Sequence, residues 1–171
     1  MIKIKVSNLS NGHYDFVLKG NVNDIGITEP YQGRFLTEVA LSKYDGQIIL
    51  DSETKINASL NCDRCNKEFG SQITSKYRMI YLFRQSSDEN ILEKTDIIFI
   101  HPDTDKIELD GEIRDYAILA VPMKKLCSED CKGLCPRCGK NLNEGPCDCK
   151  EEKIDSRWEP LQELKIKNKL K

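Results

Sequence analysis

The chain has 171 residues, of which 39% are apolar, and its 26 basic and 28 acidic side chains leave a formal net charge of −2. This length and apolar fraction suffice for one modest hydrophobic core, so we expect one domain with an appendage or two small domains. The composition excludes a strongly basic nucleic-acid-binding protein, and no apolar run approaches the roughly 18 residues of a transmembrane helix.

Charge is divided unevenly along the chain. Residues 1–120 hold 14 basic and 19 acidic side chains, whereas residues 121–171 hold 12 and 9. The first seven residues alternate apolar and polar types and lack the apolar core of a signal peptide. We therefore expect a cytoplasmic protein in a reducing compartment, where cysteines bind metal more often than they form disulfides.

Short strands and a loop are expected at the start of the chain. Residues 2–6 and 14–19 have strand-like composition. Residues 21–33 contain Gly26, Pro30 and Gly33, which are typical of a loop.

The clearest structural prediction concerns three long strands. Apolar and polar residues alternate with period two through residues 35–41, 48–60 and 73–83, which predicts antiparallel strands with one buried face. Asp45-Gly46 suits a tight turn between the first two. The predicted inner face consists of Phe35, Thr37, Val39, Leu41, Ile48, Leu50, Ile56, Ala58, Leu60, Ile73, Ser75, Tyr77, Met79, Tyr81 and Phe83.

The next elements complete an α+β fold. Residues 96–101 and 106–109 are expected to be short strands, and residues 111–120 have apolar side chains at helical spacing. Asp110 can cap this helix and Pro122 can end it. The predicted fold class is α+β: an antiparallel β-meander covered by one helix, with a C-terminal cysteine-rich segment that is zinc-ribbon-like.

Eight cysteines occur in four closely spaced pairs. Cys62-Asp-Arg-Cys65 falls at the predicted tip of the second hairpin, and six more cysteines lie within residues 127–149. That segment is too poor in apolar residues to build its own core, so a metal ion or disulfides must hold it. Two residues between cysteines let backbone N–H groups point at both sulfurs, as in zinc knuckles. We expect one or two structural Zn²⁺ ions, bound by Cys62, Cys65, Cys127, Cys131, Cys135, Cys138, Cys147 and Cys149.

The pairing of these cysteines has alternatives. The most economical arrangement joins Cys62 and Cys65 to Cys127 and Cys131, and leaves the last four cysteines for a second site, but sequence cannot establish connectivity. The spacing of Cys127 and Cys131 also fits one turn of a helix. An iron–sulfur cluster is a rival occupant, although Cys-Pro-x-Cys-Gly followed by another cysteine pair favours zinc.

No catalytic constellation is evident in the sequence. A catalytic zinc usually keeps an open position and has His or carboxylate ligands, whereas His13 and His101 stand in no such motif. Phosphate-binding loops, dinucleotide fingerprints and Ser/His/Asp patterns are absent. We therefore expect no enzyme and no small-molecule substrate. One alternative is a zinc-dependent thiol oxidoreductase or redox sensor that uses Cys62 and Cys65. Another, a DNA-binding zinc protein, lacks a recognition helix or basic ribbon.

Several motifs occur in a specific order along the chain. They are Cys62-Asp-Arg-Cys65, a helix ending at Ala120-Val-Pro122, Cys131-Lys-Gly-Leu-Cys-Pro-Arg-Cys-Gly-Lys-Asn-Leu-Asn143, Cys147-Asp-Cys149, and Asp155-Ser-Arg-Trp158 followed by Leu161 and Leu164. This order resembles the bacterial YceD family, the large ribosomal RNA subunit accumulation proteins, over about residues 35–164. The family usually has Asp-Pro-Arg where this chain has Asp-Ser-Arg. Its members vary in cysteine number, which implies a structural metal.

The resemblance implies a non-enzymatic factor that supports 23S rRNA accumulation and large ribosomal subunit biogenesis. The expected partners are a ribosomal protein of the large subunit, its precursor rRNA, or both, and no membrane. The acidic excess before residue 121 favours a basic protein partner. The expected organisation is an antiparallel domain over residues 1–122, a zinc-binding segment over 123–150 and a C-terminal tail over 151–171.

Overall fold

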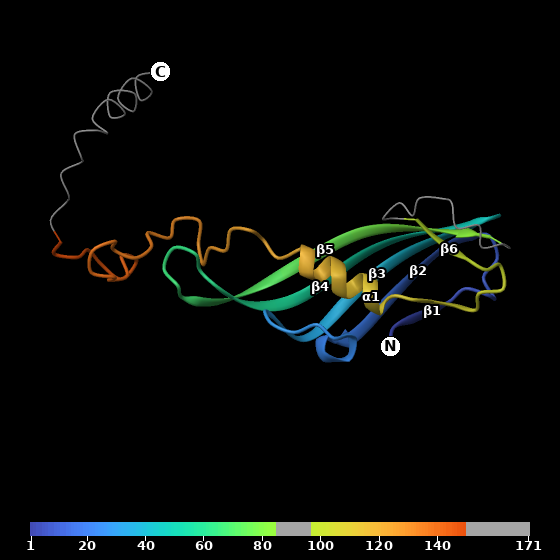
Figure 1. The fold of residues 1–171 in the computed structure, drawn as a ribbon, viewed down its shortest axis with the longest axis horizontal. Helices are drawn as coiled ribbons and strands as arrows, with labels where there is room; N and C mark the ends of the chain where they lie inside the picture. Colours follow the sequence, from blue (N-terminus) through green and yellow to red (C-terminus); the bar gives the residue numbers. More distant parts are fainter. Residues whose placement is uncertain (85–96, 150–171) are drawn as a thin grey trace, which may run out of the picture.

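A five-stranded sheet dominates the computed structural model, which describes residues 1–84 and 97–149 (Figure 1). Strands β2 (Gly12–Asn21), β3 (Tyr31–Tyr44), β4 (Gln47–Asn61) and β5 (Glu68–Phe83) pair antiparallel in chain order, and β6 (Ile97–Ile100) adds to β5 in parallel. The predicted meander is confirmed for β2 to β5. The parallel β6 departs from it, because strand direction leaves no trace in a short apolar run.

A second layer covers one face of this sheet. Strands β1 (Lys3–Lys5) and β7 (Lys106–Glu108) form a separate antiparallel pair, and helix α1 (Asp110–Leu119) follows β7 (Figure 1). Apolar side chains of all three elements join the core of the large sheet. The two strands predicted on either side of residues 102–105 therefore lie in different sheets.

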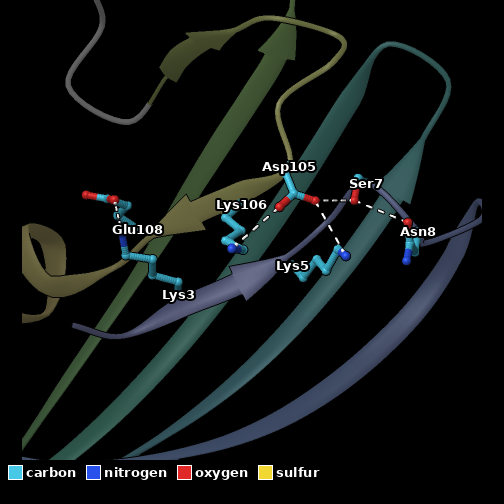
Figure 2. Close-up of polar contacts among 7 residues, drawn as sticks. All are labelled: Lys3, Lys5, Ser7, Asn8, Asp105, Lys106 and Glu108. Carbon is cyan, nitrogen blue, oxygen red and sulfur yellow. Dashed lines mark hydrogen bonds and ion pairs between the residues drawn. The ribbon is translucent and has the colours of Figure 1, made fainter.

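Ion pairs hold the small β1–β7 sheet on its exposed side. Figure 2 shows Lys3 in contact with Glu108, and Asp105 between Lys5 and Lys106. The carboxylate of Asp105 also accepts a hydrogen bond from the hydroxyl of Ser7. These polar contacts lie on the exposed side of the small sheet, and its apolar residues face the core.

The predicted inner face of the meander is confirmed, except that Phe83 is only partly buried. Polar members of this face are buried as well, since Thr37 and Thr54 are 0% exposed. Their hydroxyls lie 2.9 Å apart across the β3–β4 pair, so each partners the other in the core.

The region predicted as a loop over residues 21–33 contains regular structure. A 3₁₀ helix, η1 (Val22–Ile25), follows β2, and β3 already begins at Tyr31. Gly33 lies inside β3 with φ of +77°, where the register shifts between Gln32 and Phe35. The glycine that indicated a loop therefore serves a β-bulge.

Helix α1 begins one residue earlier than predicted. Asp110 is its first residue and not its cap, because Leu109 occupies the N-cap position without a side-chain hydrogen bond. The Asp110 carboxylate instead accepts a hydrogen bond from the backbone N–H of Ile2 at 2.6 Å, which ties the N-terminal strand to the helix. No helix in residues 1–84 and 97–149 has both the length and the apolarity to cross a membrane. The motif predicted at residues 155–164 lies outside the described residues.

Candidate metal centres

The structure brings the eight cysteines together in two groups of four. The first group consists of Cys62, Cys65, Cys127 and Cys131, and within it all four sulfurs lie within 4.8 Å of one another. The second group consists of Cys135, Cys138, Cys147 and Cys149, under the same limit. All eight are free thiols. Each group offers four sulfur ligands and could hold a metal ion.

The sulfur separations fit a tetrahedral tetrathiolate site. Metal–sulfur bonds of about 2.3 Å in a regular tetrahedron place the sulfurs about 3.8 Å apart. The Sγ atoms of Cys62 and Cys131 are 3.8 Å apart and those of Cys65 and Cys127 3.7 Å. In the second group, 3.4 Å separates the sulfurs of Cys135 and Cys147, far more than the length of a disulfide bond.

The first centre joins two distant parts of the chain. Cys62 and Cys65 come from the tip of the β4–β5 hairpin, and Cys127 and Cys131 come from the segment that follows α1 (Figure 1). Three of the four are buried, with Leu126 and Phe69 packed against them. Around Cys127 and Cys131 the backbone forms bends and turns, so this pair does not lie on one turn of a helix, the alternative that its spacing allowed.

The same knuckle occurs in both centres. In the first, the N–H of Cys62 donates to the carbonyl of Lys67 at 2.9 Å, and the N–H of Asn66 to the carbonyl of Cys62 at 2.8 Å. The second repeats these bonds between Cys135 and Lys140 at 2.8 Å and between Gly139 and Cys135 at 2.9 Å. The residue after the second cysteine is left-handed in both, with φ of +56° at Asn66 and +71° at Gly139.

The second centre is local and more open to solvent. All four of its ligands lie within residues 135–149. Cys135 is buried, Cys147 and Cys149 are partly buried, and Cys138 is exposed. An isolated β-bridge between Leu134 and Asn141 lies beside the knuckle hydrogen bonds. Neither hydrophobic cluster of the described residues includes these four cysteines, so apolar packing contributes little here.

Hydrogen bonds from outside the ligand set orient the first centre. The guanidinium of Arg64 donates to the carbonyls of Glu129 and Cys131, and the side-chain amide of Asn143 donates to the sulfur of Cys131 at 3.3 Å. Sequence reasoning missed both residues. The repeated pattern Cys-x-Arg-Cys-x-Lys, at residues 62–67 and 135–140, was the available signal for the arginine.

The cysteines differ in their tendency to ionise. Burial disfavours the thiolate of Cys62, but three backbone N–H groups around the sulfur outweigh burial and lower its pKa. The pKa of Cys135 is likewise lowered, first by the backbone N–H groups of its knuckle. Burial raises the pKa of Cys127 instead, to about 12. Each group thus contains thiols that ionise readily and thiols that resist ionisation. A metal that binds thiolates must displace the protons of the second kind.

The two histidines lie away from the cysteines, as the sequence indicated. The Nδ1 of His13 lies 2.7 Å from the Ser42 hydroxyl on the β2–β3 pair, and the Nδ1 of His101 accepts a hydrogen bond from the N–H of Asp103. Neither contributes to the two groups of possible metal ligands among the described residues.

Comparison with known proteins gives one family. The family model of the large ribosomal RNA subunit accumulation protein YceD matches residues 50–165, more than half of the chain and all eight cysteines. No solved structure matches.

Relatives come from plants and bacteria. The chloroplastic large ribosomal RNA subunit accumulation protein YCED homolog 1 of Arabidopsis thaliana is 26% identical over an alignment of 140 residues, and the match covers 68% of this chain and 44% of that protein. The Zea mays protein of the same name is 22% identical over an alignment of 145 residues, and the match covers 70% of this chain and 50% of that protein. An uncharacterized protein of Mycobacterium tuberculosis is 29% identical over 103 residues, and the match covers 60% of this chain and 48% of that protein. The chain spans about half the length of these relatives. On the family match, this chain belongs to the YceD family.

Proposed function

We propose that this protein is a non-enzymatic factor that supports 23S rRNA accumulation and biogenesis of the large ribosomal subunit. The observation that carries the proposal is the YceD family match over residues 50–165, together with the name of the Arabidopsis relative. The part of the chain that matches contains both cysteine groups and α1.

We propose further that each cysteine group binds one Zn²⁺, within a zinc-ribbon-like C-terminal segment. When bound, Zn²⁺ supplies a cross-link between thiolates, and four protein ligands leave no open coordination position for a substrate. In the first centre, Cys62 and Cys65 would fasten the hairpin tip to the loop that carries Cys127 and Cys131. The sulfur separations support tetrahedral coordination.

The thiol oxidoreductase alternative is less well supported. Such an enzyme needs a low-pKa cysteine that a disulfide substrate can reach. The pKa of Cys62 is lowered, but Cys62 is only 2% exposed and Cys65 only 7%. Buried thiols facing two further cysteines suit a metal ligand set better than an attacking nucleophile.

Charge favours a protein as the direct partner. The outer face of the sheet has a hollow lined on β2 and β3 by Asp15 and Glu38, and on β4 by Asp51 and Glu53. Lys76 pairs with Glu53 and Arg78 with Asp51, so acids and bases are both engaged, but the four acids that line the hollow outnumber these two basic residues. A basic ribosomal protein complements this face better than a phosphate backbone does.

The proposal is tested by depleting the protein in the organism that makes it. We expect a fall in the ratio of 23S to 16S rRNA and in mature large subunits, restored by the wild-type chain. A chain with Cys62→Ser and Cys65→Ser should restore neither if the metal is needed for the fold. An unchanged rRNA ratio after depletion would contradict the proposed function.

Binding measurements identify the partner. Purified protein is titrated with 23S precursor RNA and, separately, with large-subunit proteins at several salt concentrations. Direct RNA binding would weaken steeply as salt rises, because counterions are released from phosphate. We expect retained binding to a basic protein and weak, non-specific binding to RNA.

A further inference from the structure

The loop of the second centre reaches a ligand of the first. Asn143 lies between Cys138 and Cys147, and therefore within the loop that the second centre closes. Its Nδ2 donates to the Sγ of Cys131 at 3.3 Å, while its Oδ1 accepts the backbone N–H of Lys132 at 2.7 Å. One side chain thus contacts both the sulfur of Cys131 and the backbone N–H of the residue that follows it.

Short backbone contacts fix this loop against the chain between the centres. The N–H of Leu142 donates to the carbonyl of Gly133 at 2.9 Å, and the N–H of Leu134 donates to the carbonyl of Arg64 at 3.1 Å. Leu134, which precedes the loop, therefore contacts the knuckle of the first centre, and Leu142 holds the loop to the residue next to Leu134. Cys131 is 3% exposed, so its hydrogen bond from Asn143 lies in a poorly solvated place, where such bonds are strengthened.

We infer that Asn143 couples the two metal centres. Metal in the second centre closes the loop, the closed loop orients the Asn143 amide on the Cys131 sulfur, and the oriented donor tightens metal binding in the first centre. Asn143 is a positioning residue that ligates no metal itself. Because coupling of binding is reciprocal, metal in the first centre tightens the second by the same factor. This inference rests on the proposed metal binding and is independent of the ribosomal role.

The experiment measures Zn²⁺ occupancy of each centre separately in the full chain. Protein in buffered Zn²⁺ is treated with a maleimide, and mass spectrometry reports which cysteines are protected. Disabling the second centre with Cys138→Ser and Cys149→Ser should raise the free Zn²⁺ needed to protect Cys62 and Cys65 by about tenfold.

Asn143→Asp keeps the acceptor for Lys132, removes the Nδ2 donor to Cys131 and Asn141, and adds a negative charge to the loop. It should cause a similar shift of about tenfold in the wild-type background and little further shift when the second centre is already disabled. Asn141→Asp is the matched control. Asn141 Oδ1 accepts from the backbone N–H of Asn143 and from its Nδ2, and Asp keeps that acceptor. The change adds the same charge to the same loop and removes the donation to exposed Glu144, so protection of Cys62 and Cys65 should stay close to that of the wild type.

Two results would overturn the coupling: unchanged Zn²⁺ dependence of Cys62 and Cys65 when the second centre is disabled, or an Asn143→Asp effect that is equal in both backgrounds. A wild-type chain that binds no metal overturns the metal centres and the coupling together. The rRNA ratio after depletion tests the proposed function by itself, so the two failures are distinguishable.

Discussion

The guanidinium of Arg64 donates a hydrogen bond to the carbonyl oxygen of Cys131 across 2.7 Å. Arg64 lies between Cys62 and Cys65 at the hairpin tip, and Cys131 comes from the segment that follows α1. A second bond, to the carbonyl of Glu129 at 3.1 Å, fixes the same loop. One side chain thus joins both halves of the first centre independently of any metal.

Arg64→Ala should weaken Zn²⁺ binding in the first centre by about 10- to 100-fold, the usual effect of removing an outer hydrogen-bond partner. Arg64→Lys should recover only part of the loss, since an ammonium cannot reproduce the planar fork. Competition with a chromogenic chelator measures the change. Lys67→Ala, an exposed substitution at the same hairpin tip, is the control and should match the wild type.

Two glycines near the knuckles should respond differently to substitution. Gly133 and Gly139 have φ of +76° and +71°, but a Cβ on Gly133 would lie 3.0 Å from the carbonyl oxygen of Arg64, whereas one on Gly139 meets open space. Gly139→Ala should cost about 1–2 kcal/mol of local stability from backbone strain, and Gly133→Ala more than that. Chelator-induced Zn²⁺ release reports both.

Gly139→Asn supplies the control for backbone strain. Asn66 occupies the equivalent position of the first knuckle with φ of +56°. The asparagine variant should therefore bind Zn²⁺ nearly as well as the wild type. Equal damage from Gly133→Ala and Gly139→Ala would contradict the contact with Arg64.

Removal of metal should unfold the cysteine-rich segment and spare the sheet. The large core is built from β-strand and α1 side chains and includes no cysteine, whereas the small cluster around the first centre has few apolar members. Chelation should leave the far-ultraviolet β signal intact while amides of residues 123–149 lose protection from hydrogen exchange. Added Zn²⁺ should restore protection. Cooperative loss of the β signal on chelation would contradict this division.

The buried hydroxyl pair in the sheet can be tested by a double-mutant cycle. Thr54→Val leaves the Thr37 hydroxyl without its partner at 0% exposure, which should lower stability by about 1–2 kcal/mol. Changing both residues to Val should recover most of this loss, because no buried donor then lacks an acceptor. Denaturant unfolding of the four proteins measures the coupling. Additive losses would show that the hydroxyls do not act as a pair.

Glu112 should make the stability of the fold fall as the pH rises. Burial between α1 and the sheet raises the pKa of its carboxyl group, with the nearby acids Asp115 and Asp110 adding to the effect. Ionisation is thus less favourable in the folded state, and stability is lost as pH rises through the raised pKa. Glu112→Gln should raise the melting temperature at pH 7 by about 1–2 °C and have little effect near pH 4.

Glu108→Gln is the control of opposite sign. The hydrogen bond and charge of Lys3 lower the pKa of Glu108, so its contribution is present at neutral pH and lost as pH falls. This variant should be slightly less stable than the wild type at pH 7 and equal to it in acid. Parallel pH trends in the two variants would contradict the assignment for Glu112.

Local patterns in the sequence determined the long strands and the knuckles. Period-two alternation depends only on neighbouring residues, so it identified the inner faces of β3, β4 and β5. The Cys-x2-Cys spacing likewise predicted two turns that aim a pair of sulfurs at one point. Glycine and aspartate were a mixed guide. Asp45-Gly46 forms the predicted turn between β3 and β4, whereas Gly33 serves a bulge and Asp110 lies inside the helix that it was expected to cap.

The tertiary structure decided which elements meet. α1 returns the chain to the β4–β5 tip, and only that return brings Cys127 and Cys131 to Cys62 and Cys65. The roles of Arg64 and Asn143 follow from the same approach, because each contacts a ligand loop distant in sequence. The family match over residues 50–165 follows from the sequence alone. How the cysteine-rich segment is held to the sheet depends on contacts between parts of the chain that come close only after the sheet has folded.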